Sequence, residues 1–194
     1  MTSSPKITTP EIPIKLLIVE DDRTLARMIR FSFEHLLGER IEMVLAANGR
    51  DALNIIISTE IDVVLMDVRM PEMDGVEACA RIKEYDRKIP VLIFSAFTDH
   101  KTRERARLAG ADAFMPKPVD MQLVAIRILA AVKHSKLASL HHVELTNLSN
   151  RLNKLKERRA LTGIDTPIEV LIEIENIQQE IEDIKDGQTN DKIT

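Results

Sequence analysis

The chain has 194 residues, a formal net charge of −4, 44% hydrophobic residues and 30% charged residues. This length suits one domain of ordinary size with a smaller appendage, and the composition is typical of a soluble globular protein. No apolar run approaches the roughly 20 residues that a membrane helix needs, and residues 1–13 lack the apolar core of a signal peptide. We therefore expect a cytoplasmic protein without membrane contact, preceded by a disordered lead-in over residues 1–13.

The net charge also argues against nonspecific binding to nucleic acid, because such binding needs clustered Lys and Arg. The single cysteine, Cys79, cannot form an internal disulfide and lies in a helical pattern without a nearby histidine base. We interpret it as a small buried hydrophobic residue rather than a catalytic thiol.

Residues 14–134 alternate between short apolar runs rich in β-branched residues and helical patterns. Predicted strands are Leu16–Val19, Ile41–Ala46, Val63–Met66, Val91–Phe94 and Ala113–Met115. Predicted helices are Thr24–Leu37, Gly49–Ser58, Gly75–Tyr85, Asp99–Ala109 and Val119–Lys133. Asp22 or Thr24 is the expected N-cap of the first helix, and Gly38 and Gly110 follow helix ends. The pattern predicts an α/β fold with a doubly wound, five-stranded parallel sheet.

Residues 135–187 have a different pattern, in which Leu or Ile recurs at helical spacing. Two amphipathic helices are expected, separated by Thr162–Pro167, because Gly suits a helix end and Pro the first turn of the next. The first helix carries a basic cluster over Arg151–Arg159, whereas residues 165–186 are strongly acidic. We therefore predict a C-terminal helical hairpin or coiled-coil interaction module, followed by a tail over residues 188–194. The basic cluster is interpreted as pairing with the acidic helix rather than as a nucleic-acid patch.

Polar residues follow successive predicted strands, and the carboxyl ends of parallel strands meet at one edge of the sheet. Glu20 and Asp21 follow the first strand, Asp67 the third, Ser95 the fourth and Lys117 the fifth. Clustered carboxylates raise one another's pKa unless a cation lies between them, and an all-oxygen set of ligands suits Mg²⁺. The edge is therefore predicted to hold a magnesium ion.

A carboxylate can attack phosphorus to form an acyl phosphate when a metal and an ammonium group neutralise the phosphoryl oxygens. Asp67 suits the role of nucleophile, Lys117 that of the cation, and the Ser95 hydroxyl that of a third donor. Lys117-Pro118 is a candidate cis peptide, since prolyl bonds adopt cis at low cost. Taken singly, such residues are most often turn or cap residues; their joint order along the strands is what indicates a site.

Four segments resemble the receiver domain of two-component response regulators. They are Leu17–Asp22 (LIVEDD), Val64–Gly75 (VLMDVRMPEMDG), Phe94–Ala96 (FSA) and Gly110–Pro118 (GADAFMPKP). The resemblance covers about residues 15–133. It implies the strand order 2-1-3-4-5, phosphotransfer from a histidine kinase or phosphotransfer protein, and slow self-dephosphorylation.

The resemblance also implies individual roles. Asp67 becomes the phosphoacceptor, Asp21 and the backbone carbonyl of Arg69 become direct Mg²⁺ ligands, and Glu20 becomes a water-mediated ligand. Ser95 and Phe114 match a pair of switch positions that rearrange on phosphorylation, which shifts the population between two packings. Arg69 and Phe97 are bulky residues at positions that tune the lifetime of the acyl phosphate, so we expect a long-lived signal.

Residues Leu152–Ile184, especially Arg159–Pro167 (RALTGIDTP) followed by Glu173–Glu175 (EIE), resemble, less specifically, a helical hairpin attached to bacterial signalling effectors as an adaptor or self-association module. Residues 136–194 hold eight basic and eleven acidic residues, which disfavours DNA recognition. His134, His141 and His142 are interpreted as surface residues, since no Cys or carboxylate cluster completes a metal site. We expect output through a downstream protein partner, with homodimerisation as one arrangement.

Two other functions compete with this interpretation. A magnesium-dependent phosphoryl-transfer enzyme would use the same acidic edge, but phosphatases of the haloacid type need an Asp-x-Asp motif, and Val68 and Arg69 follow Asp67. A constitutive scaffold with a silent receiver is disfavoured by the complete set of site residues. The sequence therefore predicts a phosphorylation-controlled interaction protein rather than an enzyme.

Overall fold

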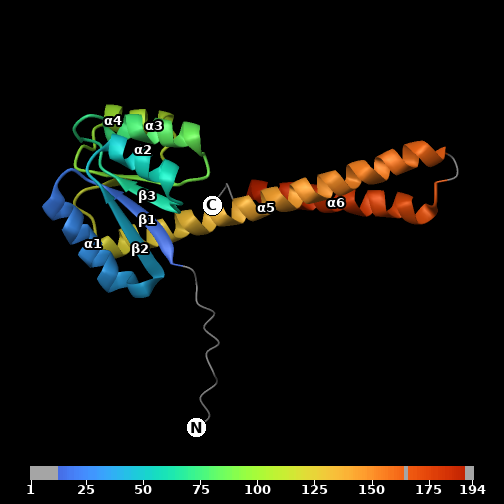
Figure 1. Cartoon of the computed structure of the whole chain (residues 1–194), viewed down its shortest axis with the longest axis horizontal. Coiled ribbons are helices and arrows are strands. Elements are labelled where there is room, and N and C mark those ends of the chain that lie inside the picture. The colour runs from blue at the N-terminus through green and yellow to red at the C-terminus, as the bar shows by residue number, and fades with distance from the viewer. Residues whose placement is uncertain (1–12, 164–165, 191–194) are drawn as a thin grey trace, which may run out of the picture. The chain divides into compact units, whose positions relative to one another are not determined.

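The structure, a computed structural model, describes residues 13–163 and 166–190, excluding the side chains of 187–190. Its centre is a five-stranded parallel sheet in the order β2-β1-β3-β4-β5 (Figure 1). The strands are β1 (Ile14–Val19), β2 (Ile41–Ala46), β3 (Val63–Met66), β4 (Val91–Ser95) and β5 (Ala113–Pro116). This confirms the predicted fold class and strand order. The lead-in over residues 1–12 lies outside the described residues.

The helices are α1 (Arg23–Leu37), α2 (Gly49–Ser58), α3 (Gly75–Tyr85), α4 (His100–Leu108), α5 (Met121–Thr162) and α6 (Ile168–Asn190), with a short 3-10 helix η1 (Gly38–Arg40) that was not predicted. Of the two candidate N-caps of α1, Asp22 is the cap, because its carboxylate accepts the N–H groups of Thr24 and Leu25. Gly38 and Gly110 both have positive φ, 56° and 88°. Each ends its helix as predicted, because glycine adopts this conformation without a Cβ clash.

The two faces of the sheet carry separate apolar cores. Alternate strand residues point to opposite faces, so Leu17 and Val64 join a core covered by α2, α3 and α4. Leu16 and Val63 join the other, which is covered by α1 and the beginning of α5. Because helices cover both faces, the polar side chains collect at the carboxyl ends of the strands.

One predicted helix boundary is wrong. The last helix of the strand-helix region was expected to end at Lys133, but α5 continues to Thr162. No Gly or Pro occurs between Met121 and Thr162, so nothing in that stretch breaks the hydrogen-bond pattern of a helix. The first helix of the predicted hairpin is therefore the C-terminal part of α5. Residues 188–190 of the expected tail belong to α6, which ends at Asn190, and residues 191–194 lie outside the described residues.

The chain divides into two compact units, residues 1–135 and 136–194. Within the second unit, α6 lies alongside the C-terminal part of α5 (Figure 1). One apolar seam joins them, with buried residues Leu148, Leu152, Val170, Ile174, Ile177 and Ile181. Arg151 forms an ion pair with Glu173 across the hairpin, and Gly163 has a φ of 58° where the chain leaves α5. The predicted seam is present, whereas residues 164–165 of the predicted turn lie outside the described residues.

Candidate functional site

Three carboxylates meet where β1 and β3 end. Glu20 and Asp21 follow β1 directly, and Asp67 follows β3. The parallel pairing of Val19 with Met66 brings Glu20 and Asp67 to neighbouring positions. Backbone hydrogen bonds hold both, from Glu20 N to Ala46 O and from Asp67 N to Val19 O, each 3.0 Å. Ligand oxygens of the three carboxylates lie within 4.8 Å of one another, as the strand order predicts.

Lys117 is the cation of this cluster. Its Nζ lies 2.5 Å from Glu20 Oε2 and 3.2 Å from Asp67 Oδ1. Burial raises the pKa of Glu20 above its usual value, the bond with Lys117 opposes the rise, and the charge of Asp67 adds to it. One ammonium group therefore faces more carboxylate charge than it neutralises, in a site where Glu20 and Asp67 are both buried.

One oxygen of Asp67 lacks a hydrogen bond. Asp67 Oδ1 is buried and is the one side-chain N or O atom so placed that has no hydrogen-bond partner within the described residues. A buried acceptor of this kind is costly unless another group binds there. The excess of carboxylate charge, the oxygen-only donors and the Asp67 oxygen that accepts no hydrogen bond all fit a hard divalent cation such as Mg²⁺.

The loop after Asp67 is built around Gly75, the first residue of α3. A Cβ at Gly75 would lie 1.9 Å from the carbonyl oxygen of Asp67, so only glycine permits this approach. The Gly75 N–H donates to Val68 O at 2.8 Å, and the preceding Asp74 caps α3 by accepting the Glu77 N–H. The Asp-Gly pair that ends the sequence motif thus fixes the backbone that carries Asp67.

Ser95 and Lys117 share a backbone link on the other side of the site. The Lys117 N–H donates to the Ser95 carbonyl at 2.9 Å, and the bond between Lys117 and Pro118 is cis, as predicted. The Ser95 hydroxyl is fully buried and accepts the Phe97 N–H at 3.4 Å. This link holds the hydroxyl residue and the ammonium residue at adjacent strand ends.

The side chains of Arg69 and Phe97 lie in direct contact. The guanidinium carbon of Arg69 is 3.4 Å from the centre of the Phe97 ring, which is a stacked cation–π contact. The sequence analysis treated them as two separate bulky residues at positions that tune the lifetime of the acyl phosphate. In the structure they form one bridge between the loop after β3 and the loop after β4.

Three arginines of α4 form contacts that the sequence analysis did not single out. Arg103 lies over the ring of Phe114, which is partly buried against the core beneath α3 and α4. Arg105 pairs with the α3 cap Asp74 at 3.0 Å, and Arg107 pairs with Glu104 within α4. The sequence does hold a sign of these contacts, because residues 100–108 contain several basic residues and almost no apolar face.

The remaining candidate residues lie away from the site. Cys79 is buried, as predicted, and burial raises the pKa of its thiol to about 11. His134 and His142 are exposed and His141 is partly buried. Among the residues that the structure describes, only Glu20, Asp21 and Asp67 form a group of three or more potential metal ligands.

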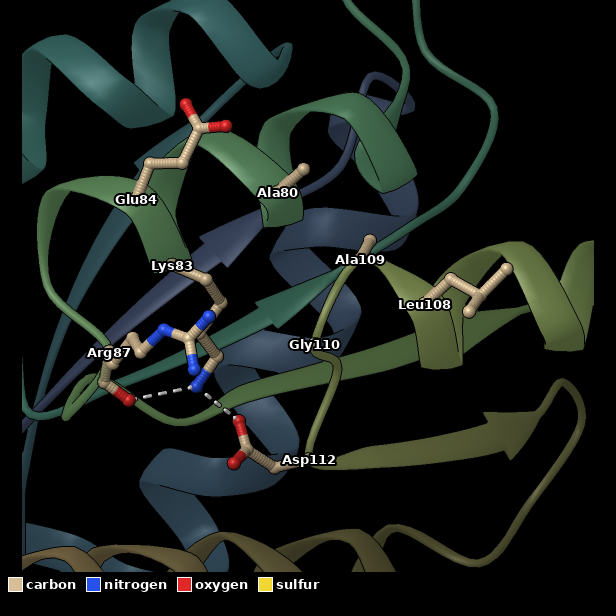
Figure 2. Close-up of a pocket in the computed structure, with 8 residues that line it drawn as sticks. All are labelled: Ala80, Lys83, Glu84, Arg87, Leu108, Ala109, Gly110 and Asp112. Carbon is tan, nitrogen blue, oxygen red and sulfur yellow. Dashed lines mark hydrogen bonds and ion pairs between the residues drawn. The ribbon is translucent and has the colours of Figure 1, made fainter.

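A separate pocket of about 670 Å³ lies between α3 and the segment that joins α4 to β5 (Figure 2). Lys83 is one of its polar lining residues, and its Nζ contacts the Arg87 carbonyl at 3.3 Å and the Asp112 carboxylate at 2.7 Å. Asp112 in turn accepts the N–H of Val91, the first residue of β4. The pocket therefore adjoins the amino ends of β4 and β5, at the sheet edge opposite the carboxylates, and its lysine is occupied by structural contacts.

Comparison with known protein families shows that residues 16–129 match the response regulator receiver domain. Response regulator MprA of Mycolicibacterium vanbaalenii is 33% identical over 124 residues, which are 64% of this chain and 52% of that protein. Regulatory protein AtoC of Escherichia coli is 34% identical over 119 residues, 61% of this chain and 25% of that protein. The chain thus spans about half of the first relative's length and a quarter of the second's.

Solved structures show the same similarity. A putative response regulator from Chloroflexus aurantiacus shares 31% identity with a TM-score of 0.57, covering 62% of this chain and 98% of that one. The receiver domain of Francisella response regulator 1452 shares 27% identity with a TM-score of 0.58, covering 63% and 98%. In the part of the chain that the structure describes, no helix combines the length and apolarity needed to cross a membrane.

Proposed function

Because the chain belongs to the response regulator receiver domain family, we propose that it accepts a phosphoryl group on Asp67 and passes the change to another protein. The observation that carries this proposal is the buried Oδ1 of Asp67, which accepts no hydrogen bond within the described residues and lies in an ion pair with Lys117 beside an acidic pair. A structural aspartate at a strand end would have its oxygens satisfied by a cap or a turn. Asp67 instead holds an acceptor ready for a new bond.

The proposed reaction is an in-line transfer to the carboxylate. A bond forms between an Asp67 oxygen and phosphorus as the bond from phosphorus to the nitrogen of a donor histidine breaks, giving an acyl phosphate. Lys117 moves from its pairing with Glu20 toward a phosphoryl oxygen, and the Ser95 hydroxyl donates to another. The donor is a histidine kinase or a phosphotransfer protein.

Glu20, Asp21, Asp67 and the backbone carbonyl of Arg69 are the residues proposed to hold Mg²⁺. When bound, the ion neutralises charge on the carboxylates and on the transferred group. The site's own residues set its position, since the chain around Glu20 and Asp67 is fixed by strand hydrogen bonds. The fit of donors and charge supports this assignment.

The proposed output is a protein–protein interaction through residues 135–187. Phosphorylation rearranges Ser95 and Phe114, and the helical hairpin transmits the change to a downstream partner or to a second copy of the chain. The acidic balance of the hairpin supports a protein partner rather than nucleic acid. We propose that the protein acts in the cytoplasm, where the kinase domains of two-component systems supply phosphoryl groups.

Acetyl phosphate with Mg²⁺ provides the direct test. Intact mass should rise by one phosphoryl group in wild type and stay unchanged in Asp67→Asn, whereas the control Glu60→Gln, at an exposed residue, should be modified normally. Modification of Asp67→Asn would show that another residue is the acceptor. Release of phosphate from an added phosphomonoester, catalytically and without a stable adduct, would favour a phosphoryl-transfer enzyme instead.

The lifetime of the phosphorylated state is proposed to depend on the stack of Arg69 on Phe97. The stack bridges the two loops beside Asp67, so it limits the approach of the water that hydrolyses the acyl phosphate. Arg69→Ala and Phe97→Ala should each speed phosphate loss about tenfold or more, and the double variant should add little because the two residues act as one unit. Wild-type loss within seconds, unchanged in both variants, would contradict this proposal.

A further inference from the structure

Helix α4 is held in place by unusually little apolar contact. Of the nine residues His100–Leu108, only Ala106 is buried. The neighbouring α3, with eleven residues, buries Gly75, Val76, Ala78, Cys79 and Ile82. A helix with so small an apolar face belongs to the less stable parts of a domain, and its position depends on its polar contacts.

Arg103 provides two of these polar contacts. Its Nε donates to the carbonyl of Thr98 at 3.1 Å, in the loop that leads from Ser95 into α4. Its guanidinium carbon lies 5.2 Å from the centre of the Phe114 ring, within the range of a cation–π interaction. One side chain of α4 therefore joins the loop that follows Ser95 to the aromatic residue of β5.

We propose that Arg103 is a positioning residue that couples α4 to Phe114 and stabilises the unphosphorylated arrangement. The proposal rests on the proposed function, in which Ser95 and Phe114 rearrange together when Asp67 is phosphorylated. A displacement of the ring or of the Thr98 loop breaks the contacts of Arg103, so these contacts favour one of the two states. A contact present in only one state shifts the equilibrium by its own interaction energy.

The equilibrium between the two states should therefore shift measurably when the contact is removed. Loss of one exposed cation–π contact corresponds to a change of about two- to fivefold in the equilibrium between the states. Arg103→Gln removes the charge and keeps much of the side chain's length. Arg107→Gln is the matched control, because Arg107 lies one turn further along α4 and pairs with Glu104 of the same helix.

The experiment is an NMR titration of the full chain with beryllofluoride and Mg²⁺, following backbone amides of residues 96–115. In Arg103→Gln, these amides should already be displaced in the free protein along the line from the free to the bound positions of wild type. The apparent affinity for beryllofluoride should be about two- to fivefold tighter. Arg107→Gln should match wild type in both measurements. A residue that only stabilised the fold would change the melting temperature without moving amides along that line.

Three outcomes would overturn the inference, and they are distinguishable. Wild type that does not respond to beryllofluoride removes the proposed function and this coupling with it. A responsive wild type with an unchanged Arg103→Gln removes the role of Arg103 alone. Equal displacement in Arg103→Gln and Arg107→Gln would show a general effect of charge on α4 rather than a contact with Phe114.

Discussion

The two units of the chain place their charged residues in opposite ways. In the first unit, Glu20 and Asp67 are buried, and the side chain of Lys117 is only 14% exposed. In the hairpin, the ion pair of Arg151 with Glu173 has side chains 61% and 37% exposed, and the seam beneath it is apolar. The first unit thus buries one charged cluster in addition to its exposed ion pairs, whereas the ion pair described in the hairpin lies at the surface.

This difference indicates that the first unit carries the binding site, whereas the hairpin is held together by packing. Buried like charges destabilise a fold unless they are compensated, so their presence in the first unit indicates a site that binds something. Exposed opposite charges contribute little stability and mainly favour one pairing over others. The hairpin is therefore expected to depend on its apolar seam, whereas the sheet tolerates an unfavourable cluster because two large cores stabilise it.

The strongest test of this comparison is removal of an apolar seam residue. Ile177→Ala should destabilise the hairpin by about 2–5 kcal/mol, because Ile177 is 3% exposed in a seam with few other members. Hydrogen exchange of α6 amides would measure the loss. The control Ile172→Ala, at a residue 51% exposed on the same helix, should cost less than about 1 kcal/mol. Equal effects of the two variants would show that the seam does not hold the hairpin together.

A smaller effect of opposite sign is expected in the first unit. Without Mg²⁺, Asp67→Asn should raise the free energy of unfolding by about 1 kcal/mol. The substitution removes the charge of one of three clustered carboxylates, while Lys117 remains paired with Glu20. Denaturant unfolding with and without Mg²⁺ would measure this. Added Mg²⁺ should stabilise wild type and have little effect on the variant. A less stable variant would mean that the pairing of Asp67 with Lys117 outweighs the repulsion.

The smallest effect is expected for the exposed ion pair. Arg151→Ala and Glu173→Ala, combined in a double-mutant cycle, should give a coupling of about 0.2–1 kcal/mol that falls as salt is added. A coupling of several kcal/mol, insensitive to salt, would contradict the contrast between buried and exposed charge.

Much of the site was predictable because its residues follow successive strands of a parallel sheet. Alternating strand and helix patterns predicted the sheet, and that sheet brings Glu20, Asp21, Asp67, Ser95 and Lys117 to one edge. The helix boundaries marked by Asp22, Gly38 and Gly110 were also predictable, because a cap acts within a few residues of the chain. The end predicted for the last receiver helix at Lys133 was wrong, since that stretch holds no residue that stops a helix.

Periodicity and capping are local properties, so they were enough to predict most elements, their order and the polar residues that meet at the carboxyl ends of the strands. Only the tertiary structure decided which side chains touch across that edge. The stack of Arg69 on Phe97, the pairing of Arg105 with Asp74 and the contact of Arg103 with Phe114 all join residues from different elements. Such contacts depend on side-chain packing between distant segments, which no local pattern encodes.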